Sequence, residues 1–242
     1  NYSYLIIDEK NKNACVVDPS EAQPIINYLD KNNIKLAFIL NTHHHYDHVG
    51  GNSELKKKYK AKVVGYIDDA KRIPDIDILV KDGEIWSKNN FKAKIKHIPG
   101  HTLGHICFYF FNEQNVFTGD TLFSLGCGKI FEGTYLQMYE SLNFFKSLPL
   151  ETKIYCGHEY TLQNSKFCIK YDYNNKNLKN KIININKNLK NNSPTIPSTI
   201  KDELECNIFL RSDNLNIQTE LNFNNKNSLE TFSKLRDLKD NF

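Results

Sequence analysis

A cluster of histidines constrains this chain more than any other feature of its sequence. Four of the eight histidines lie in the run Thr42-His43-His44-His45-Tyr46-Asp47-His48. The apolar run Leu36 to Leu40 precedes the cluster and is short enough for a buried strand, and Val49-Gly50-Gly51-Asn52-Ser53 follows it with turn and capping signals. We therefore predict that the cluster lies on a loop between a strand and a helix that spans residues 54–59.

The spacing of these side chains suits two metal ions. His43 and His45 alternate by two, so both can point to one side of an extended segment, whereas Asp47 and His48 follow as the chain turns and can face a second point. One loop thus offers two ligand pairs to ions about 3.5–4 Å apart, as in two-metal sites. Imidazole and carboxylate without thiolate suit zinc, iron or manganese. The alternative is that surface histidines cluster here by chance, which becomes much less plausible when four of them share one loop.

Three later segments supply further ligands by the same design, a strand-like run followed by a turn and a ligating residue. They are Phe91 to His101, Val116 to Asp120 and Ile154 to His158. The carboxylate of Asp120 follows a short apolar run directly and is suited to bridging two cations. No histidine lies beyond His158, so we expect the ligand chemistry and the C-terminal part of the chain to be separate.

Composition excludes several other classes of protein. With 242 residues, of which 40% are hydrophobic, the chain can bury a core, and no apolar run approaches the roughly 18 residues of a membrane span. The net charge of +4 comes from lysines scattered among asparagines, which offers nucleic acid no dense basic block. The six cysteines form no CxxC pair, so we expect buried free thiols in a reducing compartment, cytoplasmic by default. An organelle stays open because the sequence begins at Asn1 rather than Met.

The pattern along the chain predicts an α/β part followed by a helical part. Expected strands span residues 4–7, 14–17, 36–40, 91–98 and 106–111, with shorter ones at Val63-Val64 and Ile154. Expected helices span residues 25–29, 54–59, 136–148, 162–171, 177–189 and 229–238. From about Tyr160 the strand signals stop, residues 193–198 form a Pro-rich break, and the Asn-rich stretch 212–227 gives no prediction.

The motifs HxHxDH, GHTxGH, TGDTLF and YCGHEYT, in that order, resemble the metallo-β-lactamase superfamily. Within it, the Thr-His-His-His-Tyr-Asp-His run, Gly126-Cys127-Gly128-Lys129 before Phe131-Glu132-Gly133, and Pro194-Thr195-Ile196-Pro197-Ser198-Thr199 resemble glyoxalase II, the hydroxyacylglutathione hydrolases. The resemblance runs nearly end to end. It implies a four-layer αββα sandwich over residues 1–160 as the metal-binding catalytic domain, and a small helical substrate-binding domain over residues 161–242.

The resemblance also implies a ligand set for two divalent metal ions, for which we expect zinc, with iron or manganese left open. One ion is assigned to His43, His45 and His101, the second to Asp47, His48 and His158, and Asp120 bridges both together with a water. As catalytic residues, Asp47 and Asp120 orient and tune the site. Three histidines are left over: we expect His44 to have a structural or supporting role, His105 to pack or hydrogen-bond near its turn, and His97 to pack on its strand.

The implied activity is hydrolysis of S-D-lactoylglutathione to glutathione and D-lactate, the second step of methylglyoxal detoxification. Two cations lower the pKa of a bridging water toward about 7, so that a hydroxide attacks the thioester carbonyl without a protein nucleophile. The residues implied to bind substrate are Lys129, Phe131, His158, Tyr160, Arg236 and Lys239. Arg236 and Lys239 are three residues apart and can share one helical face, although solvated helix charge is the alternative for both. Phe131 stands where many relatives carry tyrosine, so a hydroxyl contact is expected to be missing.

Two other functions stay open. A persulfide dioxygenase shares the HxHxDH loop but uses a single iron and ordinarily lacks a helical C-terminal extension. A metal-stabilised binding module without catalysis is the second alternative, which the complete ligand set disfavours. We expect a small-molecule glutathione thioester as the partner, no nucleic acid and no membrane, and we favour a monomer.

Overall fold

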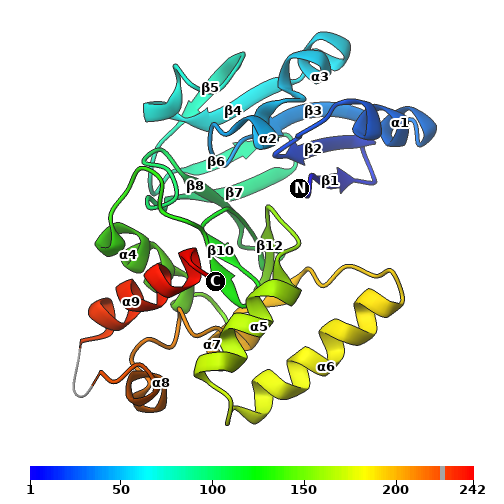
Figure 1. The fold of residues 1–242 in the computed structure, drawn as a ribbon. Helices are drawn as coiled ribbons and strands as arrows, with labels where there is room; N and C mark the ends of the chain where they lie inside the picture. The colour runs from blue at the N-terminus through cyan, green and yellow to red at the C-terminus, as the bar shows by residue number, and fades with distance from the viewer. Residues whose placement is uncertain (224–226) are drawn as a thin grey trace. The chain divides into compact units, whose positions relative to one another are not determined.

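The computed structural model describes residues 1–223 and 227–242, which divide into two compact units (Figure 1). Unit 1 comprises residues 1–97 and 104–119, and unit 2 comprises residues 98–103 and 120–242. The turn over residues 98–103 therefore belongs to unit 2, although it interrupts unit 1 along the sequence. Each unit has its own strands and its own core.

The first sheet of unit 1 has five strands in chain order: β1 (Tyr4–Asp8), β2 (Asn13–Val17), β3 (Lys35–Leu40), β4 (Lys62–Tyr66) and β5 (Ile76–Val80). The pair β1–β2 is antiparallel and the other pairs are parallel. Parallel neighbours require crossovers, and α1 (Gln23–Lys31) and α3 (Asn52–Tyr59) provide two of them. Leu29 of α1 and Leu55 of α3 belong to one buried core with Ile39 and Val63 of the sheet.

The second set of strands in unit 1 is an antiparallel meander of β6 (Ile85–Lys88), β7 (Phe91–His97), β8 (Ile106–Phe110) and β9 (Asn115–Gly119). Aromatic rings join it to the first sheet. Phe38 meets Trp86 edge to face at 5.1 Å between ring centroids, and Tyr66 stacks on His97 at 4.7 Å. The two sheets thus share an aromatic core, and His97 packs on its strand as expected.

Unit 2 is mainly helical. Its helices are α4 (Tyr135–Lys146), α5 (Thr161–Tyr171), α6 (Lys176–Lys190), α7 (Ile200–Cys206), α8 (Leu215–Glu220) and α9 (Ser228–Asp240). Its strands are the ribbon β10 (Leu122–Phe123) with β11 (Gly126–Cys127), and the antiparallel pair β12 (Lys153–Cys156) with β13 (Ser198–Thr199). Phe209 packs between Phe167 of α5 and Phe232 of α9, with ring centroids 5.9 and 6.1 Å away. These rings fix α9 in the helical core.

The helices expected at the start of unit 2 and in its C-terminal part are present, but the prediction that strands stop near Tyr160 was wrong. β13 begins inside the Pro-rich break and pairs with Lys153 and Ile154. Two residues are too few to leave a period in the sequence, and the partner strand lies far away along the chain. α7 and α8 were also not predicted; α8 lies in the Asn-rich stretch, of which residues 224–226 fall outside the described residues.

Two expectations from composition also have an outcome. All six cysteines are buried and free. Among the described residues, no helix is both long enough and apolar enough to cross a membrane.

Candidate metal centre and substrate pocket

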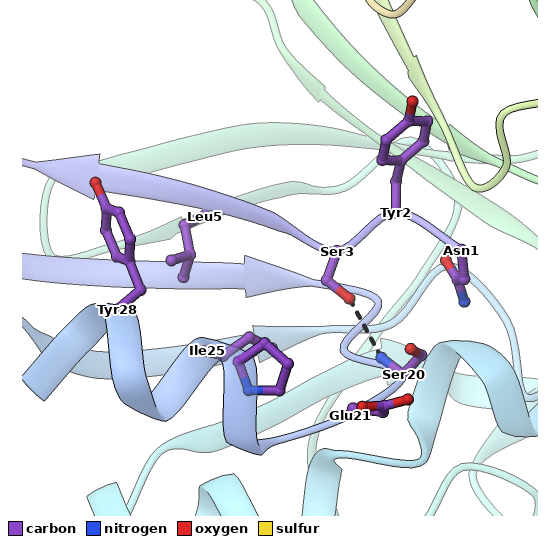
Figure 2. A pocket seen from close by; sticks show the side chains of 9 residues that line it. Asn1, Tyr2, Ser3, Leu5, Ser20, Glu21, Ile25 and Tyr28 are labelled. Atoms are coloured by element: carbon purple, nitrogen blue, oxygen red, sulfur yellow. Dashed lines mark hydrogen bonds between the residues drawn. The ribbon is translucent and has the colours of Figure 1, made fainter. Parts of the chain in front are cut away.

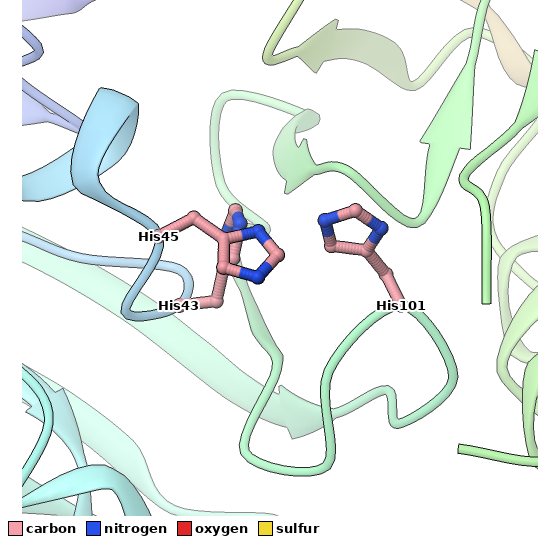
Figure 3. A group of neighbouring side chains, drawn as sticks. All are labelled: His43, His45 and His101. Atoms are coloured by element: carbon pink, nitrogen blue, oxygen red, sulfur yellow. The ribbon is translucent and has the colours of Figure 1, made fainter. Parts of the chain in front are cut away.

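The histidine loop of unit 1 begins after β3, as the sequence predicts, but its last residues, Tyr46 to His48, lie in α2 (Tyr46–Val49), a short helix that the sequence did not predict. His43 and His48 are fully buried, with ring centroids 4.2 Å apart, and the ring of His45 lies 4.7 Å from that of His43. Figure 3 shows His43 and His45 projecting from this loop. The Asp47 carboxylate lies 3.5 Å from Nε2 of His48. One short loop thus presents three imidazoles and a carboxylate together.

A carboxylate that the sequence interpretation missed supports this loop. Asp18 follows β2 and is 2% exposed. It accepts hydrogen bonds from the backbone N–H of Thr42 (2.8 Å), the Thr42 hydroxyl (2.6 Å) and Nδ1 of His48 (2.9 Å). Because an ionised carboxylate only accepts, Nδ1 of His48 carries the proton and Nε2 keeps its lone pair for a metal ion. The signal was available: Asp18 follows the apolar pair Val16-Val17 just as Asp120 follows its strand.

A second carboxylate holds His44 beside the ligand loop. Nδ1 of His44 lies 3.3 Å from Oδ2 of the buried Asp69. Asp69 also accepts a hydrogen bond of 3.0 Å from Nε of Arg72. This contact supports the structural or supporting role expected of His44.

His105 packs directly against a predicted ligand. It is buried and its ring stacks on that of His43, with 4.5 Å between centroids and 17° between planes. Gly119 has a φ of +48°, and a Cβ there would lie 2.4 Å from Oγ1 of Thr42 and 2.6 Å from Cε1 of His105. Glycine is required at this position, because both its conformation and the space exclude a side chain.

Unit 2 brings together the three later ligand candidates. Nε2 of His101 lies 3.6 Å, and Nε2 of His158 3.4 Å, from Oδ2 of Asp120. His101, drawn in Figure 3, lies on the turn after β7, and its Nδ1 donates to the carbonyl of Lys129 at 2.7 Å. A carbonyl only accepts, so Nε2 of His101 also keeps its lone pair. Nε2 of His101 is thus suited to bind a cation beside Asp120, and His158 presents its own Nε2 to the same carboxylate.

The donors present in each unit fit divalent metal ions. They are imidazole nitrogens and carboxylate oxygens, the donor types that zinc, iron and manganese accept. In both units a buried histidine has its Nδ1 proton bound by an oxygen, Asp18 for His48 and Lys129 for His101. Such partners fix the tautomer and orientation of metal-binding histidines.

A cavity of about 330 Å³ lies in unit 2 and contains most of the residues expected to bind substrate. Lys129, Tyr160, Arg236 and Lys239 line it, together with Phe123 and Asn164. The ring of Tyr160 stacks on that of His158, with centroids 4.9 Å apart. Phe131 does not line the cavity; it is 61% exposed, and its ring lies 5.1 Å from that of His101.

The two cations of α9 differ in their surroundings. Nζ of Lys239 lies 5.3 Å from the ring of Phe167 and 5.1 Å from that of Phe242. Burial, followed by the nearby charge of Arg236, lowers the pKa of Lys239. The guanidinium of Arg236 instead donates to the carbonyl of Cys127.

A separate hollow of about 470 Å³ lies in unit 1, beside the first residues of the chain (Figure 2). Tyr2, Leu5, Ile25 and Tyr28 are among its lining residues, and the N–H of Ser20 donates to Oγ of Ser3 beside it. It contains no residue predicted for the site, so its size alone gives it no role.

Comparisons with known proteins agree over the whole chain. Residues 1–158 match the model of the metallo-beta-lactamase superfamily, and residues 159–242 match that of the hydroxyacylglutathione hydrolase C-terminus. A hydroxyacylglutathione hydrolase of Pelagibacter ubique (strain HTCC1062) is 68% identical over 242 residues, which cover 100% of this chain and 95% of that relative.

Two solved structures share the fold. ETHE1 from Myxococcus xanthus has a TM-score of 0.69 at 24% identity, covering 98% of this chain and 84% of that one. TTHA1623 in a di-iron-bound form has a TM-score of 0.56 at 26% identity, covering 64% and 86%. The protein has the metallo-β-lactamase fold with a C-terminal helical region, as predicted, and it belongs to the hydroxyacylglutathione hydrolase family.

Proposed function

We propose that this protein hydrolyses S-D-lactoylglutathione, and 2-hydroxyacylglutathiones of the same kind, to glutathione and the free 2-hydroxy acid. The observation that carries the proposal is the cavity of unit 2, where Lys129 and Lys239 lie with Tyr160, whose ring stacks on His158. Glutathione carries carboxylates, which these cations suit. The relative in Pelagibacter ubique, named for this activity, supports the same conclusion.

The reacting centre is proposed to hold two divalent metal ions. His43, His45 and His101 would hold one, Asp47, His48 and His158 would hold the other, and Asp120 would contribute to both. Zinc is the metal we propose, and iron or manganese suits the same donors; TTHA1623 is described in a di-iron-bound form. When bound, such ions supply an activated water and polarise the thioester carbonyl.

The residues of the chain hold the reactants in place during hydrolysis. The water oxygen joins the acyl carbon, the C–S bond breaks, and the departing sulfur takes up a proton to give the thiol. Asp47 and Asp120 orient the reacting water, and Lys129, Tyr160, Arg236 and Lys239 form the wall of the cavity that receives the glutathione part. Phe131, which lies outside this cavity and beside the ring of His101, is proposed to contact the substrate with a ring that has no hydroxyl. We assign metal binding and catalysis to residues 1–160. Residues 161–242 contribute Arg236 and Lys239 to substrate binding, together with Lys129 and Tyr160 of the first range.

Release of free thiol from S-D-lactoylglutathione tests this proposal. We expect the metal-loaded protein to release thiol, removal of metal by a chelator to stop it, and added zinc to restore it. Asp120→Ala should lose metal and activity together. Oxygen uptake with glutathione persulfide, without thioester hydrolysis, would instead identify a dioxygenase. Metal binding with neither reaction would leave a binding module.

A further inference from the structure

Arg236 is buried among polar groups of its own unit. It is 4% exposed, and its guanidinium lies 5.3 Å from the ring of Phe209. Its Nη1 donates to the carbonyl of Cys127 at 2.7 Å and lies 3.5 Å from that of Gly128, while its Nη2 donates to Asp240 at 2.9 Å. A guanidinium fixed in this way binds the backbone of a neighbouring segment firmly, because charge-assisted hydrogen bonds are stronger than neutral ones.

The segment that Arg236 binds also forms a hydrogen bond, one residue further along, with the predicted metal ligand His101. The carbonyl after those of Cys127 and Gly128 is that of Lys129, which accepts the 2.7 Å hydrogen bond from Nδ1 of His101. Three successive carbonyls are therefore involved: Nη1 of Arg236 donates to the first, lies 3.5 Å from the second, and His101 donates to the third.

The same segment is packed too closely to shift without disturbing the ligands. A Cβ at Gly128 would lie 1.9 Å from the carbonyl oxygen of Asp120 and 3.3 Å from Nδ1 of His101. The N–H of Gly128 also donates to the carbonyl of Thr121 at 3.1 Å. Gly128 thus packs closely against the Asp120 backbone and beside the His101 ring, so we expect a displacement at Cys127 to reach both.

We propose that Arg236 is a positioning residue for His101: by holding the carbonyls of Cys127 and Gly128, it sets the Lys129 carbonyl that orients the His101 ring. This rests on the proposed function, since His101 is taken as a metal ligand. It gives α9 a second role beside its part in the wall of the cavity. The charge of Arg236 then acts on the affinity for metal as well as on the affinity for substrate.

Metal affinity in the absence of substrate tests the inference. Metal-free wild-type protein and the variants Arg236→Met and Lys239→Met are titrated with zinc against a chelating dye, and with cobalt to record the visible absorption of the bound ion. We expect Arg236→Met to bind metal about 10–100-fold more weakly, the usual effect of losing a group that orients a ligand, and to change the cobalt spectrum. Lys239→Met, one turn further along the same helix, should keep the metal affinity and cobalt spectrum of the wild type.

Two further variants keep the test decisive if Arg236→Met does not fold. Arg236→Lys keeps the charge but has a single nitrogen in place of the two that donate to Cys127 and Asp240, so we expect a metal affinity between those of wild type and Arg236→Met. Asp240→Ala removes only one anchor of the guanidinium, and we expect a loss of severalfold. Wild-type metal affinity in all folded Arg236 variants, with only a raised KM for the thioester, would overturn the inference.

The result is separable from that of the proposed function. A wild-type protein that binds two metal ions but releases no thiol would refute the hydrolase assignment, and a weakened metal affinity in Arg236→Met would still support the positioning role. Conversely, normal hydrolysis together with an unchanged metal affinity in Arg236→Met would remove the positioning role and leave the hydrolase.

Discussion

Replacing Asp18 with asparagine separates the charge of one buried carboxylate from its shape. Asp18 has a φ of +50°, a conformation that asparagine and aspartate adopt more readily than alanine, so the backbone should be kept. In Asp18→Asn one oxygen can still accept from the N–H of Thr42, but an NH₂ group replaces the oxygen that accepts from the Thr42 hydroxyl and from His48. The amide cannot accept the Nδ1 proton of His48.

The imidazole can avoid this conflict only by moving its proton to Nε2, the nitrogen we assign to the metal. We therefore expect Asp18→Asn to weaken metal binding by about 10–100-fold, which corresponds to about 1.4–2.7 kcal/mol. If the ring instead keeps its tautomer, a buried N–H loses its acceptor, which costs about 1–3 kcal/mol of folding free energy. Either way the structure predicts a loss of at least about 1 kcal/mol.

Two titrations distinguish these outcomes. Zinc affinity is measured against a chelating dye, and the free energy of unfolding of the metal-free protein is measured in urea. Thr42→Val is the comparison variant: it removes the hydroxyl that donates to Asp18 and contacts Nδ1 of His43, but leaves the Asp18 carboxylate and His48 in place. If Asp18→Asn matched the wild type in both titrations, Asp18 would not control the tautomer of His48 and our reasoning would be refuted.

Three further predictions follow from unit 2. Burial and the charge of Arg236 lower the pKa of Lys239, so its ammonium loses its proton at a lower pH than an ordinary lysine, whose pKa is about 10.5. We therefore expect KM for the thioester to rise as the solution is made alkaline, and to begin rising below that pH. Lys239→Arg, which stays charged, should abolish the rise. Burial raises the pKa of Glu203 above its ordinary value of 4.5. The protonated carboxyl therefore stabilises the fold fully below pH 4.5, and this stabilisation is lost as the pH rises through the raised pKa. The free energy of unfolding in urea, measured from about pH 4 to pH 8, should depend less on pH in Glu203→Gln than in the wild type. Gly128→Ala would place a methyl group 1.9 Å from the Asp120 carbonyl, and we expect a loss of about 1–3 kcal/mol of folding free energy in urea unfolding, contradicted by a stability equal to that of the wild type.

The sequence predicted those parts of the structure that have a local signal. Local patterns predicted the strand before the histidine cluster, from its apolar run, and the turn after it, from its glycines. Apolar periodicity predicted the helices of the C-terminal part. The helices α3, α5, α6 and α9 lie where they were expected. β13 has no such signal: it consists of two residues that pair with β12, a partner distant in sequence. α7 does have a local signal that the sequence interpretation missed, because Thr199 caps it by accepting from the N–H of Asp202.

The supporting groups of the site were harder to predict than its candidate ligands. Residue type and spacing identify the candidate ligands His43, His48, His101 and Asp120 in the sequence. Asp18, in contrast, lies 30 residues before His48, the histidine that it orients. The partner of His101 is the backbone carbonyl of Lys129, a group that every residue type carries. No sequence pattern could therefore identify it. Arg236 was expected among the substrate contacts; the structure adds its bond to the Cys127 backbone.

Activity measured as a function of bound metal tests the central claim most directly. Metal-free protein is titrated with zinc while bound metal and thiol release from S-D-lactoylglutathione are recorded together. We predict that thiol release rises with bound metal and reaches its plateau at two ions per chain. Full thiol release by the metal-free protein, or a plateau of bound metal at two ions with no thiol released, would contradict the account.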